Sequence, residues 1–259
     1  MNRFRLPRLS VFRRSGEPLR VTIGPDGVTL SWTARPNGGA GGVVTLDFRE
    51  TAPEALLEEP ERYGTRLAER LRAAGARSTV AVLKLPLDWT SALRAERPVG
   101  LPEGDTAAFL DLQAERAAPF GGAGWRLAPP PPPLPGAAAD ALLVAAVLPE
   151  PRWLALQRFA AAAGLRWVSV QTDAPAAMAD DAPLALELTP FGDRVIVAAR
   201  ARGRLIEWGS LPAATTADRA QLAAGLRVFA RALPAPAGAP RTLRWRGQPP
   251  PELAGAVEA

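Results

Sequence analysis

The first fifty residues contain three short segments in which apolar and polar residues alternate, a pattern typical of half-buried strands. Residues 19–23 and 28–32 flank the turn Gly24-Pro25-Asp26-Gly27, in which proline presets φ and glycine accepts a positive φ. The third segment, residues 43–48, follows a glycine cluster at 37–42. Since a strand and not a helix follows this cluster, the pattern favours a hairpin loop over a phosphate-binding loop.

A helical spacing replaces the alternation after residue 59. Tyr63, Leu67 and Leu71 share one face, which predicts a helix over residues 60–74. Residues 80–85 show little alternation, as in a strand that is buried on both faces. A hairpin, a helix and a central strand in this order predict the beginning of an α/β fold.

Residues 90–173 alternate between strands and helices on a smaller scale. The expected strands lie at 91–99, 124–128, 141–147 and 166–171, and the expected helices at 105–117 and 150–163. The order β-α-β-β-α-β is a split βαβ arrangement. We expect Phe109, Leu112, Leu156 and Phe159 to be buried together under one face of its sheet.

The last block, residues 183–259, opens with a hairpin. A strand over 184–188 runs into Thr189-Pro190-Phe191-Gly192, and a second strand leaves at 194–198. A tight turn after an acid is where some ATPases hold a phosphate, but proline has no N–H and phenylalanine adds a Cβ where such loops use glycine. Further elements are expected in the order strand (204–208), helix (Leu222, Leu226 and Phe229 on one face) and strand (241–245).

The composition limits the available chemistry. The chain of 259 residues is 47% apolar and 22% charged, as is ordinary for a globular protein, but it contains no histidine and no cysteine. These absences exclude an imidazole base, a thiolate and a zinc site with nitrogen or sulfur ligands. Acidic and hydroxyl side chains remain, together with Tyr63 and the sole lysine, Lys84.

The net charge of +5 comes from residues 1–16, because the rest of the chain carries 26 basic and 26 acidic side chains. A flexible, solvated tail explains this segment, and a weak contact with an anionic membrane is the alternative. A basic tail on a neutral body argues against nucleic-acid binding. No segment reaches the ~18–20 apolar residues that span a bilayer, and no signal peptide is evident. The candidate membrane-contact residues are Arg3, Arg5, Arg8, Arg13 and Arg14.

Several short motifs occur in a distinctive order. Residues 83–120 contain Leu85-Pro86, Leu101-Pro102, and Glu115 followed by Pro119-Phe120. Residues 141–178 follow with a strand, a helix, Ala-Gly-Leu and a strand, and then come the hairpin 184–208 and TLRWRG at 242–247. In this order the chain resembles the actin-like, PilM-type proteins of type IV pilus assembly and the cytoplasmic domain of the type II secretion L-component.

The resemblance implies a degenerate actin-like α/β fold with two RNase H-like halves. The first half would comprise residues 17–89 and 174–182, and the shortened second half residues 183–259, with a βαββαβ subdomain inserted at 90–173. The link between the 204–208 strand and the last helix is too short to hold the fourth (IIB-like) subdomain of full actin-like proteins.

The resemblance also implies three nucleotide loops, all degenerate here. Thr22 stands where the first loop has an acid, near Gly24. In the second loop Glu187 stands at the acid and Thr189 at the glycine, and Pro190 follows with no N–H to donate. The third loop retains Gly247, followed by glutamine and three prolines. We therefore expect no nucleotide cofactor, no metal ion and no catalysis.

The resulting hypothesis is a non-catalytic scaffold of a type IV pilus or type II secretion inner-membrane platform, cytoplasmic and peripheral to that membrane. Its expected partners are the cytoplasmic segment of a single-span membrane protein, bound between the first half and the inserted subdomain, and the ATPase of the same system. No nucleic-acid partner is expected. The alternatives are an active actin-like ATPase and an unrelated α/β protein.

Overall fold

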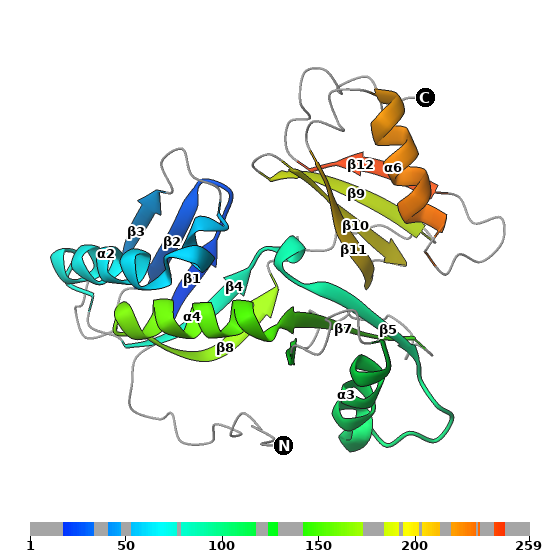
Figure 1. Cartoon of the computed structure of the whole chain (residues 1–259), viewed down its shortest axis with the longest axis horizontal. Helices are drawn as coiled ribbons and strands as arrows, with labels where there is room; N and C mark the ends of the chain where they lie inside the picture. Colours follow the sequence, from blue (N-terminus) through cyan, green and yellow to red (C-terminus); the bar gives the residue numbers. More distant parts are fainter. Residues whose placement is uncertain are drawn as a thin grey trace.

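A computed structural model describes residues 18–33, 41–47, 53–76, 79–117, 124–128, 142–172, 184–191, 194–201, 204–212, 219–231, 233 and 241–246. The described part of the chain forms three sheets with helices packed on them. In Figure 1 a five-stranded sheet lies at the left, a four-stranded sheet at the upper right and a three-stranded sheet below it. The expected mixed α/β class is therefore confirmed.

The five-stranded first sheet has the order β3-β2-β1-β4-β8. β1 pairs antiparallel with β2 and parallel with β4, and β4 pairs parallel with β8. These pairings confirm the expected hairpin and central strand. The strands are β1 (Leu19–Ile23), β2 (Gly27–Trp32), β3 (Gly42–Asp47), β4 (Val80–Leu85) and β8 (Arg166–Thr172).

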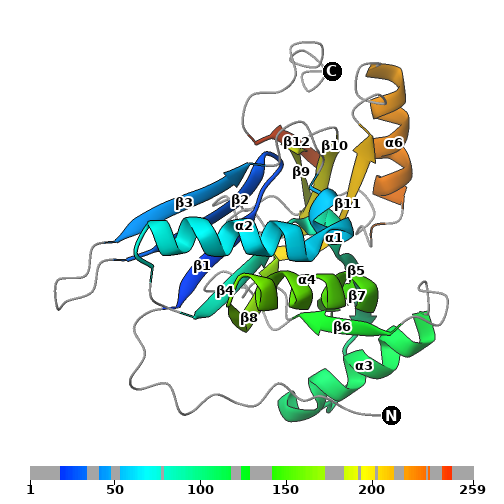
Figure 2. The same ribbon diagram turned by 60° about the vertical axis from the view of Figure 1, so that its left-hand side comes forward.

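Three helices cover one face of the first sheet: α1 (Ala55–Glu58), α2 (Pro60–Ala73) and α4 (Glu150–Ala162). Figure 2 shows α2 and α4 lying side by side across the strands. Leu67 of α2 and Phe159 of α4 are fully buried in one core with Leu83 of β4. Gly64 permits this close approach, because a Cβ there would overlap the carbonyl oxygen of Phe159.

The second sheet has the order β11-β10-β9-β12 and repeats the plan of the first. In each sheet three strands form an antiparallel meander, and a helix then returns the chain to a fourth strand parallel to the first. Here the returning helix is α6 (Arg219–Arg231), which carries the buried Leu222. The strands are β9 (Leu184–Phe191), β10 (Arg194–Ala201), β11 (Arg204–Pro212) and β12 (Arg241–Trp245).

The third sheet, with the order β5-β7-β6, lies in the chain between β4 and α4, and we call it with α3 the insert. One of its faces packs on α3 through Leu93, Leu110 and Val147. The other face packs on the second sheet, where Val144 and Ala146 meet β10 and β11. The insert comprises β5 (Ser91–Glu96), α3 (Thr106–Ala117), β6 (Trp125–Ala128) and β7 (Leu142–Pro149). Two 3-10 turns, η1 (Leu87–Trp89) and η2 (Glu103–Asp105), precede β5 and α3.

The expected βαββαβ unit over residues 90–173 is wrong in its second part. β8 pairs with β4, and α4 packs on α2, so residues 150–172 complete the first sheet. Leu156 and Phe159 accordingly belong to the first core and not to the insert. A strand pattern in the sequence does not specify the neighbouring strand, so it could not place β8.

The expected burial of Leu112 is also wrong. Leu112 is 44% exposed, whereas Leu110 and Ala114 form the buried face of α3. Leu110 and Ala114 are four residues apart and lie over one another on the helix, while Leu112 lies on the opposite side. Phe109 is partly buried at the margin of the Leu110 cluster.

Candidate functional site

The hairpin between β9 and β10 is longer and more regular than the sequence predicted. Thr189 pairs with Ile196, Pro190 with Val195, and Phe191 with Arg194. Thr189 and Pro190 are therefore strand residues, and the connecting residues 192–193 lie outside the described part. A paired, extended backbone does not present the converging N–H groups that surround a phosphate.

Glu187 is buried in β9 and is held by two arginines. Its Oε2 accepts hydrogen bonds from Arg200 Nε at 3.0 Å and from Arg246 Nε at 3.1 Å. Its Oε1 accepts one from Arg246 Nη2 at 3.3 Å. Glu187 is only 2% exposed, so this carboxylate is surrounded by structural ion pairs. The one acid that remains in the second loop is thus engaged in the fold.

Thr22 and Gly24 of the first loop also have structural roles, both within the first sheet and its β1–β2 turn. Thr22 lies within β1, opposite Thr29 on one side and Lys84 on the other. The Gly24 N–H donates to the Gly27 carbonyl at 2.8 Å, which closes the β1–β2 turn. Among the described residues, neither Thr22 nor Gly24 makes a hydrogen bond or an ion pair with Glu187. Gly247 and the five arginines of the tail lie outside the described residues.

The hairpin contributes a different charged group, which the sequence analysis missed. Arg194, the first residue of β10, forms ion pairs with Glu54 Oε1 at 3.1 Å and with Asp88 Oδ2 at 3.5 Å. Glu54 immediately precedes α1 and Asp88 lies in η1, so these contacts join the second sheet to the first half of the chain. Asp88 stands inside a segment that carried the family resemblance, but nothing in its spacing marks it as paired.

The Asp88 carboxylate is buried, and its ion pair with Arg194 offsets only part of the cost of burying its charge. Its side chain is 1% exposed, and neither carboxylate oxygen makes a hydrogen bond within the described part of the chain. Burial raises the pKa of Asp88, the guanidinium of Arg194 opposes that shift, and the nearby Glu54 carboxylate adds to it. Arg152 of α4 also lies close and donates to the Trp89 carbonyl at 2.7 Å.

A second set of contacts joins β11 to the segment around β5. Trp208 Nε1 donates to Thr90 Oγ1 at 3.1 Å, and Arg94 forms an ion pair with Glu207 at 2.9 Å. Burial raises the pKa of Glu207, against the opposing charge of Arg94. Trp208 is 4% exposed and packs in an apolar cluster with Leu87 of η1.

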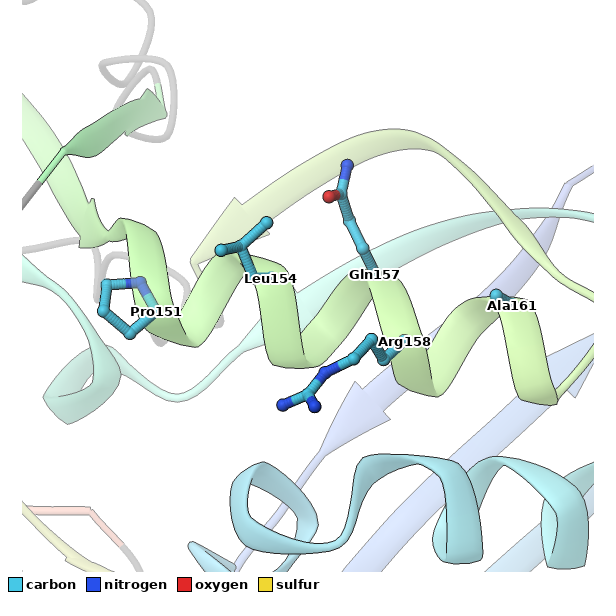
Figure 3. Close-up of a pocket in the computed structure, with 5 residues that line it drawn as sticks. All are labelled: Pro151, Leu154, Gln157, Arg158 and Ala161. Atoms are coloured by element: carbon cyan, nitrogen blue, oxygen red, sulfur yellow. The ribbon is translucent and has the colours of Figure 1, made fainter.

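A shallow, open surface lies along the exposed side of α4. We call it the α4 face, and it consists of Pro151, Leu154, Gln157, Arg158 and Ala161. Figure 3 shows Leu154, Gln157 and Ala161 projecting from one side of the helix, while Arg158 turns toward α2. Arg158 lies 3.5 Å from Glu61 of α2, and both side chains are more than half exposed. The α4 face therefore offers an apolar surface that is bordered by the exposed ion pair between Arg158 and Glu61.

In the described part of the chain, no group of three or more acidic side chains is arranged to hold a metal ion. None of the helices in the described ranges combines the length and apolar character needed to cross a bilayer.

Comparison with known proteins gives structural matches only. No protein-family model and no curated protein sequence matches the chain. The structure of a PilM–PilN type IV pilus biogenesis complex matches with a TM-score of 0.55 and 18% identity, over 83% of this chain and 70% of that chain.

Two other solved structures match with lower scores. The cytoplasmic domain of EpsL, an inner-membrane component of the type II secretion system of Vibrio cholerae, gives a TM-score of 0.48 and 12% identity, over 88% of this chain and 82% of that one. A Bacteroides thetaiotaomicron protein with an actin-like ATPase fold gives 0.48 and 9%, over 89% and 82%. The expected resemblance to PilM-type proteins is thus confirmed as a resemblance of fold.

Proposed function

We propose that this chain is a non-catalytic cytoplasmic scaffold of a type IV pilus or type II secretion inner-membrane platform. In this role it binds the cytoplasmic segment of a single-span membrane protein. The fold shared with a protein of the PilM–PilN complex supports the proposal that this chain belongs to such an assembly system. The proposal that the chain is non-catalytic rests on the ion pairs that Glu187 forms with Arg200 and Arg246.

The partner segment would bind along the α4 face, at the boundary between the first half and the insert. α4 packs on α2 on one side and is tied to β6 on the other, where Arg126 lies 3.1 Å from Glu150. The Glu150 N–H also donates to the Gly124 carbonyl at 2.8 Å. Leu154, 50% exposed, supplies an apolar surface of the kind that anchors short peptide segments in grooves.

The basic tail would provide a second, weaker attachment to the inner membrane. Each arginine near an anionic leaflet contributes about 1 kcal/mol, and salt screens the contribution. The scaffold would thereby be peripheral to the membrane, with the α4 face turned toward its partner. Contact with the ATPase of the same system is part of the proposal.

A matched pair of leucine variants tests the partner site. Leu154→Arg adds a charge on the α4 face, and Leu112→Arg adds the same charge at a similarly exposed leucine of α3. Binding of peptides from the cytoplasmic ends of single-span proteins encoded beside this chain is measured by calorimetry. Leu154→Arg should weaken binding at least tenfold, roughly 1.4 kcal/mol, and Leu112→Arg should not. Equal effects of the two variants would exclude the α4 face.

The tail is tested separately from the partner site. Deleting residues 1–14 should leave peptide binding unchanged and reduce sedimentation with anionic vesicles at low salt. Loss of peptide binding with vesicle binding intact would reverse the two assigned roles.

Calorimetry with millimolar Mg-ATP tests whether the chain binds a nucleotide, which an active ATPase must do. The proposal requires that no binding tighter than ~100 μM is seen, which corresponds to roughly 5.5 kcal/mol. Tighter binding would favour an active ATPase.

A further inference from the structure

Within the described part of the chain, the second half, meaning the second sheet with α6, contacts the rest through apolar packing on the insert and through two sets of polar contacts. One attachment lies at Glu207 and Trp208 of β11, which contact Arg94 and Thr90. The other lies at Arg194, which contacts Glu54 and Asp88. Glu207 pairs across the sheet with Ala199, five positions along β10 from Arg194, or roughly 16 Å of extended strand.

The two attachments differ in chemistry. The β11 attachment combines an ion pair and a hydrogen bond with an apolar cluster, which includes Leu87 and Trp208 and extends along β10 to Ile196. The Arg194 attachment consists of ion pairs at the end of a hairpin, and Arg194 itself is 36% exposed. The apolar cluster does not depend on charge, whereas the Arg194 attachment depends on the charges of Arg194, Glu54 and Asp88. The Arg194 attachment therefore suits a latch.

Asp88 makes the Arg194 attachment sensitive to a single charge. The charged groups that face it within the described part are Arg194 of β10, Arg152 of α4 and Glu54 before α1. Arg152 uses its Nη1 on the Trp89 carbonyl, and Glu54 repels Asp88. Without Arg194, the buried Asp88 carboxylate faces the negative charge of Glu54, and Arg152 is the remaining positive charge nearby. A buried carboxylate in this position gains from access to water.

We propose that Arg194 is an intramolecular latch that holds the two halves of the chain closed by compensating Asp88, without a bound ligand. The hairpin that resembles a phosphate loop thus joins the two halves through its own side chain. The latch requires neither the proposed partner nor the α4 face.

The absence of cysteine permits a direct test, because two introduced cysteines are the only sites for spin labels. Glu69→Cys on α2 and Ala224→Cys on α6 are at exposed positions in the two halves. The label-to-label distance distribution is measured by pulsed electron paramagnetic resonance at pH 8, without ligand. The parent protein should give one narrow distribution, and Arg194→Gln should add a second, longer distance.

Two further variants separate compensation from packing. Adding Asp88→Asn to Arg194→Gln should restore the narrow distribution, because the stranded charge is gone. Arg62→Gln removes an exposed ion pair within the first half and should leave the distance distribution unchanged. Should Arg194→Gln lose the far-UV circular dichroism of the fold, Arg194→Met is measured instead. Methionine removes the charge and keeps much of the side-chain length, so the longer distance should appear again.

The latch is refuted if the Arg194 variant keeps the parent distribution, or if Asp88→Asn fails to restore it. Neither result affects peptide binding at the α4 face. A failure of the latch is therefore distinguishable from a failure of the proposed function.

Discussion

Replacing Glu187 by glutamine separates a structural acid from a catalytic one. Glutamine keeps the shape of the side chain and removes its charge, so no cavity is created. The buried Arg200 side chain, 5% exposed, then keeps its charge and loses its ion pair with Glu187. A residue retained for catalysis would instead tolerate this change with little loss of stability.

The expected loss follows from the geometry of the ion pairs. Three hydrogen bonds between 3.0 and 3.3 Å join Glu187 to its two arginines. Removing one partner of a buried ion pair costs about 3–5 kcal/mol, because the remaining charge is uncompensated. Arg246→Ala should cost less, since Arg246 is 22% exposed and the pair between Glu187 and Arg200 survives.

The loss is measured by urea unfolding followed with far-UV circular dichroism and tryptophan fluorescence. Coincident transitions are required before a single free energy of unfolding is assigned. Glu61→Gln is the matched control, since Glu61 is 57% exposed and its pair with Arg158 should contribute no more than about 0.5 kcal/mol. A loss below ~1 kcal/mol for Glu187→Gln would refute the structural role and reopen a catalytic one.

Three further predictions concern packing and pH. Leu110→Ala should destabilise the protein by about 2–5 kcal/mol and the exposed Leu112→Ala by less than ~1 kcal/mol in urea unfolding; the reverse order would mean that α3 is rotated. Gly64→Ala should cost about 1–3 kcal/mol in thermal unfolding, because its Cβ would lie 2.7 Å from the Cβ of Ala162, whereas Gly104→Ala meets nothing within 4 Å and should be neutral. Burial raises the pKa of Asp88, so the folded protein binds this proton more tightly than the unfolded one, and the contribution is present at acid pH and lost as the pH rises through the raised pKa. Asp88→Asn should therefore be more stable than the wild type at pH 8, with the difference shrinking toward pH 4; a constant difference between urea midpoints would contradict this.

Local patterns in the sequence were sufficient to predict the long helices and most of the strands. The helix over 60–74 and the strand over 80–85 were expected from apolar spacing and are observed as α2 and β4 within one residue. The β9–β10 hairpin was expected too, but its strand continues through Thr189 and Pro190. Proline marked a turn in the sequence, although a strand tolerates it where no N–H is needed.

The partners of each element could not be read locally. β8 joins β4 across an intervening insert, and Arg194 meets Asp88 although more than one hundred residues separate them. Such contacts depend on how whole sheets pack, which a single sequence does not encode in any local spacing. The degenerate loop residues were identified by resemblance, while the compensation of Glu187 by Arg200 and Arg246 required the register of β9, β10 and β12.

The insert has a consequence for the closure of the first sheet. β4 ends at Leu85 and α4 begins at Glu150, so the first sheet must close a loop far longer than an ordinary connection. As a flexible coil, that loop would add roughly 2 kcal/mol of closure entropy relative to a short link. However, the strands at its two ends are antiparallel neighbours, with Ser91 opposite Val147.

Once β5 and β7 have paired, the chain enters and leaves the insert at neighbouring points. The closure entropy is then offset by contacts inside the insert, and α4 can return to α2 as if the connection were short. The pairing of β5 with β7 therefore reduces the entropy cost of closing the first sheet across the insert.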